Sequence, residues 1–98
     1  MSDVMEMVRF NLADSADAAA LRAGAQAIEG WLSSQPGFVS RSLVGPDAAG
    51  RWTDLVRWRS LAEAQAAARQ LPTLPEAGAF LALLDMGTVE MSHLPVLR

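Results

Sequence analysis

Cysteine and lysine are both absent from the sequence. Without cysteine the chain has no disulfide bond, no thiolate nucleophile and no cysteine ligand for a metal. Without lysine it cannot form a Schiff base with a carbonyl substrate. Composition alone therefore excludes these two kinds of covalent catalysis.

Long apolar runs and runs of one charge sign are also missing. No apolar run reaches the roughly 18 residues of a membrane-spanning helix. The first residues show no basic segment followed by an apolar stretch, as a signal peptide would. The net charge of −3 comes from eleven acidic residues and eight arginines dispersed along the chain. We therefore expect a cytoplasmic protein whose partners include neither nucleic acid nor a membrane.

What the chain does have is a large apolar share for its size. Its 98 residues suffice for one compact domain with one core, so we expect a single domain over residues 1–98. Apolar residues make up 51% of the chain and charged residues only 19%. So much apolar surface on so small a domain predicts that part of it is buried against a second surface, outside the domain's own core.

Runs rich in β-branched and aromatic residues, bounded by turn residues, predict four strands. They are Val4–Phe10, Phe38–Val44, Trp52–Trp58 and residues 87–94. Between the first two strands, apolar residues recur at helical spacing. They predict a helix that is capped at Asp14 or Ser15 and ends near Ser33.

A second helical segment follows the third strand. Ser60 and Glu63 form a capping box at its start, and Pro72 marks its end because a proline disfavours helical geometry in the residue before it. A short further helix is expected over residues 75–84. The order of elements is therefore strand, helix, two hairpin strands, helix, strand.

This order is typical of a ferredoxin-like βαββαβ sandwich, an α+β fold with a four-stranded antiparallel sheet. Helices cover one face of that sheet and leave the other bare. We assign Phe10, Val56 and Trp58 to the bare face, where they form too large an apolar patch to stay in water. A symmetric second copy would bury it, giving a homodimer closed into an α/β barrel.

Segments along nearly the whole chain resemble one known family. They are residues 6–10, 35–38, 52–60 and 90–94. The most specific parts are Pro36-Gly37-Phe38 before the second strand and the Trp-x-Ser junction of Trp58 and Ser60. In these segments the chain resembles the antibiotic biosynthesis monooxygenase-like domains of the dimeric α/β-barrel superfamily.

The resemblance implies a dimeric barrel with a cavity for a small ligand and no cofactor. The superfamily includes cofactor-independent oxygenases acting on polyketide phenols, haem-degrading enzymes, polyketide cyclases and proteins with no established activity. Haem degradation is not expected, since residues 61–84 contain no histidine to bind iron and no tryptophan. The cyclase-like relatives place histidines where this chain has Glu6 and Asp54, so the cavity is implied but the cyclase chemistry is not.

Glu6 and Asp54 are each the polar exception on an otherwise apolar strand face, and Glu90 on the last strand is expected to join them. Carboxylates gathered in a low-dielectric cavity repel one another, which raises a pKa and makes a general acid or base. The alternative, which we favour, is that the acids pair with Arg9, Arg41 or Arg57 or lie in water at the cavity mouth. These arginines could instead hold a ligand carboxylate or phenolate, although pairing with nearby acids is their more common role. The three acids have no local ligand spacing, so no metal site is expected.

His93 is the only histidine. Histidine is the one type of side chain that titrates near neutral pH without help, so His93 is the best single candidate for a proton shuttle. A lone histidine at a strand end is more often a structural or rim residue, and that alternative stays open.

Bulky residues on the same strand faces are candidates for ligand binding. Trp52 and Trp58, with Phe10 and Val56, are expected to line the cavity, and the tryptophans could stack on a flat aromatic ligand. Core packing is the more common role of each tryptophan.

Together these features predict a homodimer with one cavity per subunit for a small, mostly apolar or aromatic molecule. If the site is catalytic, we expect cofactor-free oxygenation or proton transfer, with His93, Glu6 or Asp54 moving the proton. The alternative is a non-catalytic ligand-binding or structural dimer, and the residues leave this choice open.

Overall fold

The computed structural model describes residues 2–97 and confirms the expected order of elements. The main elements are β1 (Val4–Phe10), α1 (Ala18–Ser33), β2 (Phe38–Val44), β3 (Trp52–Trp58), α2 (Leu61–Gln70), α3 (Pro75–Leu81) and β4 (Glu90–Pro95). Two short 3₁₀ turns, η1 (Leu71–Thr73) and η2 (Met86–Thr88), precede α3 and β4. Within residues 2–97, no helix has the length and apolar character needed to cross a membrane.

The first three strands have the predicted bounds, whereas the start of α1, the end of α3 and both ends of β4 differ. The α1 cap is Asp17, whose carboxylate accepts a hydrogen bond from the Ala20 N–H at 2.8 Å, and not Asp14 or Ser15. Helix α3 ends at Leu81, three residues earlier than expected. β4 starts at Glu90, because the residues before it form η2.

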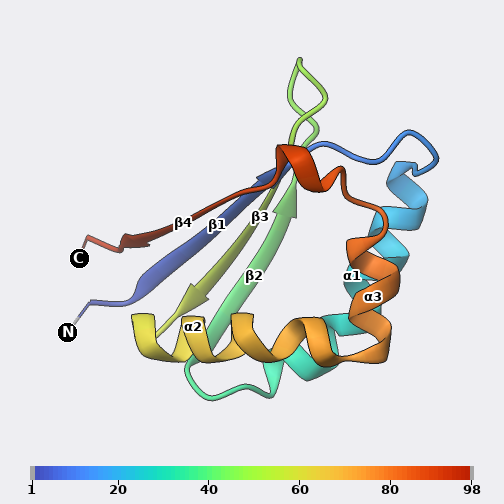
Figure 1. Ribbon diagram of the computed structural model, residues 1–98. Coiled ribbons are helices and arrows are strands. Elements are labelled where there is room, and N and C mark those ends of the chain that lie inside the picture. The colour runs from blue at the N-terminus through green and yellow to red at the C-terminus, as the bar shows by residue number, and fades with distance from the viewer. Residues whose placement is uncertain (1, 98) are drawn as a thin grey trace.

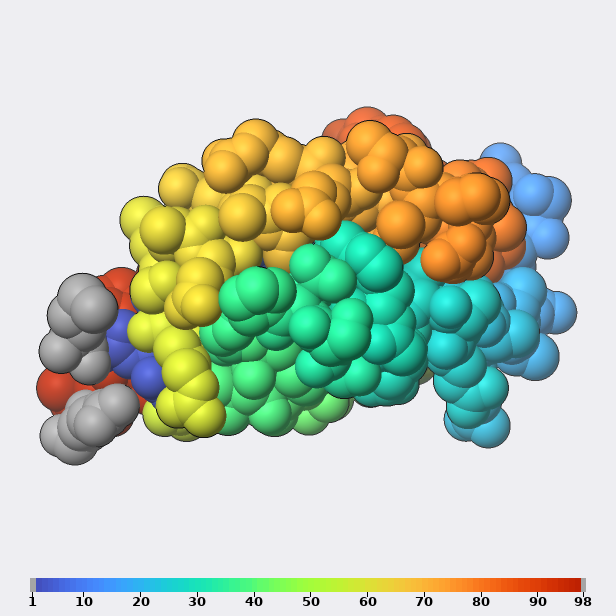
Figure 2. Space-filling model, turned by 90° about the horizontal axis from the view of Figure 1, so that it is seen from below, coloured from blue at the N-terminus to red at the C-terminus, as the bar shows by residue number. Residues whose placement is uncertain are grey.

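All strand pairs are antiparallel, and the sheet order is β2-β3-β1-β4. This is the ferredoxin-like arrangement that the sequence predicts. Figure 1 shows the strands as one twisted layer with the helices packed beside it. Seen from below, in Figure 2, α2 and the segment after it lie directly against the end of α1 and the start of β2.

The core lies between the helices and one sheet face, in two neighbouring clusters. In one, Phe10 of β1 packs with residues of α1 and α3; in the other, Trp58 of β3 packs with α2 and the end of α1. Phe10 and Trp58 are 0% exposed and Val56 is 4% exposed. Our assignment of these three residues to the bare face is therefore wrong. Strand alternation shows which residues share a face, but it does not show which face meets the helices.

The open face of the sheet carries the other set of side chains. By strand register these are Met5, Met7 and Arg9 of β1, Thr53, Leu55 and Arg57 of β3, Ser40, Ser42 and Val44 of β2, and Glu90, Ser92 and Leu94 of β4. This face is more polar than expected. Its apolar part is a central stripe that contains Met5, Met7 and Leu55.

The two family-like motifs contact each other where β2 begins and β3 ends. The carbonyl of Gly37 accepts a hydrogen bond from the Arg59 N–H at 2.8 Å. Gly37 has a φ of 84°, and a Cβ at this position would overlap the carboxyl group of Glu63. The Ser60 hydroxyl accepts from the Glu63 N–H at 3.2 Å and donates to its carboxylate at 2.9 Å, which confirms the predicted cap.

Candidate functional site

A cavity of about 200 Å³ lies between the helix-covered sheet face and the helices. Val8, Phe10 and Val56 contribute to it from the strands, and Leu71 and Phe80 from the helical side. All of its lining residues are apolar except Glu6, Arg41 and Asp54. A concave, mostly apolar space with a few convergent polar groups is typical of a small-molecule site.

Glu6 and His93 form a hydrogen-bonded pair beside this cavity. They are opposite each other on β1 and β4, and Nε2 of His93 lies 2.8 Å from Oε2 of Glu6. Glu6 is only 8% exposed. Burial raises the pKa of Glu6 above its usual range, the charge of Asp54 adds to this, and the hydrogen bond and charge of His93 oppose it. The carboxyl group is thus suited to taking and releasing a proton closer to neutral pH.

Asp54 is held by an arginine in the cavity wall. Nε and Nη2 of Arg41 donate to its two carboxylate oxygens at 3.0 and 2.6 Å, a bidentate ion pair. Arg41 also donates to the carbonyl of Ala25 in α1 at 3.1 Å, and its guanidinium lies 5.8 Å from the centre of the Phe80 ring. The ion-pair alternative therefore describes Asp54.

Strand register places the polar groups in order across the cavity floor. Arg41 on β2 is opposite Val56 on β3, Val56 is opposite Glu6 on β1, and Glu6 is opposite His93 on β4. In this row of the sheet, the cation of Arg41 lies on one side of the apolar Val56, and the ionisable acid Glu6 lies on the other. Among the described residues, no three His, Asp or Glu side chains form a group that could hold a metal ion.

The other predicted ligand-binding residues separate into two sets. Phe10 and Val56 line this cavity, which lies on the helix-covered face and not on the bare face to which they were assigned. Trp58 lies outside its wall and packs edge-to-face on Phe38 with ring centres 5.9 Å apart. Trp52 lines a separate groove between α1 and the end of β2. The expectation that both tryptophans line the cavity is therefore wrong, and Trp58 fills the core.

Glu90 does not join Glu6 and Asp54. It lies opposite Arg9 on the open face, and its carboxylate is 2.7 Å from Nη2 of Arg51. The expected grouping of three acids is wrong because it depends on the register of β1 with β4, which neither strand sequence reveals.

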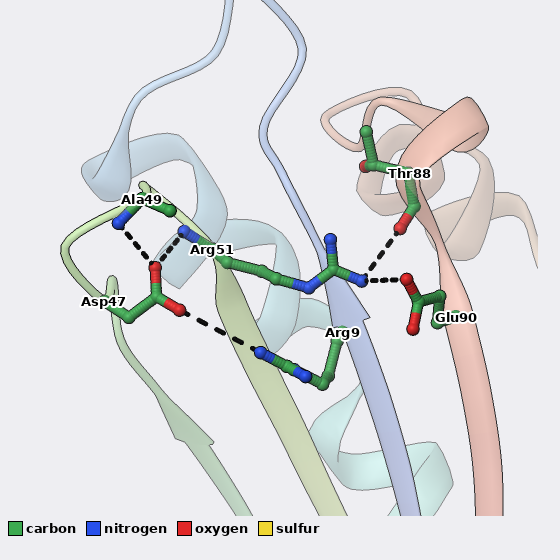
Figure 3. Close-up of polar contacts among 6 residues, drawn as sticks. All are labelled: Arg9, Asp47, Ala49, Arg51, Thr88 and Glu90. Carbon is green, nitrogen blue, oxygen red and sulfur yellow. Dashed lines mark hydrogen bonds and ion pairs between the residues drawn. The ribbon is translucent and has the colours of Figure 1, made fainter.

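Arg51 belongs to a polar network at the end of the sheet, shown in Figure 3. Its guanidinium extends past β1 to Glu90 and to the Thr88 carbonyl, which is 3.4 Å away. Asp47, in the β2–β3 loop, accepts hydrogen bonds from the backbone N–H groups of Ala49 and Arg51, both at 2.9 Å. The network ties that loop to the start of β4. This position matters because Met86, Val89 and Met91 of the same segment form one end of the cavity.

Two features of the site were not predicted. Arg41 was one of three arginines that could hold a ligand carboxylate or phenolate or pair with an acid, and only the structure places it in the cavity wall. Pro72 was predicted only as the end of a helix and Leu71 had no predicted role, whereas both line the cavity from the segment after α2. Arg41 did carry a signal, because it is the one charged residue in an otherwise uncharged β2 segment.

No family model matches the chain, and no curated protein matches it in sequence. Solved structures do match its fold, which is that of antibiotic biosynthesis monooxygenase-like proteins, as the resemblance predicted. SnoaB from Streptomyces nogalater, a cofactor-independent oxygenase, aligns with a TM-score of 0.80 and 22% identity over 100% of this chain and 96% of its own. A protein from Bordetella bronchiseptica, assigned as an antibiotic biosynthesis monooxygenase, aligns with a TM-score of 0.80 and 16% identity over 100% of both chains. Rv0793 from Mycobacterium tuberculosis aligns with a TM-score of 0.67 and 25% identity over 99% of this chain and 97% of its own.

Proposed function

We propose that this protein binds a small aromatic or enolic molecule in the cavity and oxygenates it with molecular oxygen, without a metal or organic cofactor. The observation that carries the proposal is the Glu6–His93 pair beside an apolar cavity. The structural likeness to the cofactor-independent oxygenase SnoaB supports the reaction class.

In this mechanism Glu6 is the general base. Its ionised carboxylate takes the proton of a phenolic or enolic hydroxyl, which leaves an electron-rich phenolate or enolate. That anion gives electrons to oxygen directly, so the substrate supplies the reducing power. For a phenol converted to a quinone, one oxygen atom enters the ring, the other leaves as water, and the ring loses four electrons.

His93 is the route by which the proton leaves Glu6. Its Nε2 contacts the Glu6 carboxylate, while its side chain is 20% exposed and so reaches solvent. An imidazole can accept a proton at one nitrogen and release one from the other. The pair can therefore restore an ionised Glu6 after each turnover.

We further propose that the protein is a homodimer that meets through the open sheet face. The apolar stripe containing Met5, Met7 and Leu55 lies at the centre of this face. The charges around it are already paired, Arg57 with Asp3 at 2.8 Å and Arg51 with Glu90 at 2.7 Å. A self-complementary surface of this kind suits a two-fold interface.

Oxygen uptake with a panel of phenols tests the proposed activity. We expect uptake by the wild-type protein and a loss of at least about a hundredfold in Glu6→Gln, the scale of general-base catalysis. Glu29→Gln is the matched control, since Glu29 is exposed on α1 away from the cavity. Phenol binding without oxygen uptake would instead support the non-catalytic binding alternative, and uptake that persists in Glu6→Gln would overturn the role of Glu6.

A further inference from the structure

We infer that this cavity accepts a single-ring phenol or enol, not a fused polycyclic one, and that Arg41 binds the substrate oxygen. The inference rests on the proposed function and names the substrate class of the same site. It is carried by the cavity volume, by the rigidity of the walls and by the hydrogen-bond inventory of Arg41.

The volume sets an upper limit on the ligand. An engineered apolar cavity of about 150 Å³ binds benzene, while pockets for drug-sized molecules span about 300–1,000 Å³. The present cavity, at about 200 Å³, lies just above the first value and below the second range. It therefore has room for one substituted ring.

The sheet and helix walls offer little room for expansion, whereas Met86 and Met91 at one end of the cavity are exposed. Val56 and Phe10 belong to the two central strands, which are hydrogen-bonded on both sides. Phe80, from α3, is only 5% exposed and is packed in the core. Arg41 links β2 to α1 through the Ala25 carbonyl. Such interiors are close-packed, so a second fused ring would have to displace core side chains or extend into solvent past Met86 and Met91.

Arg41 has donors to spare. A guanidinium carries five N–H groups, and Arg41 uses two on Asp54 and one on Ala25. The remaining two have no acceptor among residues 2–97, although the side chain is only 4% exposed. A buried donor without an acceptor costs free energy, and a phenolate or enolate oxygen would satisfy it with a charge-assisted hydrogen bond.

The strand register places Arg41 and Glu6 on either side of one apolar residue. The two residues lie in one row on strands separated by β3, so their backbones are roughly 10 Å apart. Val56 occupies the position between them and offers an apolar surface for the ring. Across this distance, the two side chains can extend toward each other and reach the same hydroxyl oxygen of a ring that lies on Val56.

Calorimetric titration of the wild-type protein with phenol, 2-naphthol and 9-phenanthrol tests the size limit. We expect Kd to rise along the series, by about tenfold or more from phenol to 9-phenanthrol. Leu81→Ala removes a cavity-lining side chain and should tighten 2-naphthol binding relative to phenol; Leu83→Ala, which loses the same atoms outside the cavity wall, should not. Equal or tighter binding of 9-phenanthrol by the wild type would overturn the size limit.

Toluene tests the role of Arg41, because it keeps the ring of phenol and lacks the hydroxyl group. We expect phenol to bind the wild type about tenfold or more tightly than toluene, the scale of a hydrogen bond to a charged group. Arg41→Lys keeps a positive charge beside Asp54 with fewer donors and should narrow this difference. Equal affinities for phenol and toluene in the wild type would overturn the inference even if Arg41→Lys failed to fold.

Oxygen uptake separates this inference from the proposed function. If phenol binds as expected but consumes no oxygen, the proposed oxygenation fails and the ligand class holds. If 9-phenanthrol consumes oxygen and phenol neither binds nor reacts, the size limit fails and the oxygenation holds.

Discussion

Oε2 of Glu6 lies 2.8 Å from Nε2 of His93, although the two residues are 87 positions apart in the sequence. The pairing joins a buried acid on a central strand to a partly exposed base on the edge strand β4. The ionisation of Glu6 therefore depends on the folded structure, and this dependence can be measured.

Glu6 should make stability depend on pH. Its pKa is raised in the folded protein, mainly by burial, above the usual value of 4.5. Between these two pKa values the folded state holds a proton that the unfolded state has lost, so this contribution to stability falls as pH rises through the window. Urea unfolding of wild type and Glu6→Gln from pH 4 upward should show the wild-type free energy of unfolding declining relative to the variant. A constant difference would contradict the raised pKa.

Asp54→Ala should be strongly destabilising, because it leaves the buried guanidinium of Arg41 without its ion-pair partner. Loss of one member of such a pair costs about 3–5 kcal/mol. The double variant Arg41→Leu with Asp54→Leu should recover much of this loss, since no unpaired charge remains. Denaturant unfolding of both variants measures how much of the lost stability is recovered. A double variant as unstable as Asp54→Ala would argue against the unpaired charge as the cause of the destabilisation.

Gly37→Ala should destabilise the junction of β2 with α2. The positive φ strains any other residue by about 1–3 kcal/mol, and the added Cβ overlaps Glu63. Gly30→Ala is the matched control in α1, where a Cβ meets nothing within 4 Å and should stabilise the helix by about 0.5–1 kcal/mol. The melting temperature should therefore fall in Gly37→Ala and rise in Gly30→Ala. A Gly37→Ala variant as stable as the wild type would refute the steric argument.

The proposed dimer gives a prediction about mass. Light scattering at micromolar concentration should give about twice the mass of one chain. Leu55→Glu places a charge in the apolar stripe and should yield monomers, whereas Leu61→Glu, at a 44% exposed position on α2, should not. A monomeric wild-type protein would exclude the barrel.

The sequence by itself predicted the elements and much of the fold, because these depend on local periodicity. Alternation along β1 correctly placed Glu6 on the same face as Phe10, and alternation along β3 placed Asp54 with Trp58. The Ser60 cap was likewise predictable from the spacing of two nearby residues. Such patterns need no knowledge of distant contacts.

The tertiary structure alone decided which face the helices cover and which residues meet there. Burial of Phe10 and Trp58 beneath helices, and not against a second copy, depends on how the whole helical layer packs. Glu6 meets His93 because of the register of β1 with β4, and a shift of one residue would put Glu90, and not His93, on the same sheet face as Glu6. Arg41 reaches Asp54 and Ala25 only after β2, β3 and α1 have assembled. The site is thus a product of long-range packing, which local sequence patterns do not encode.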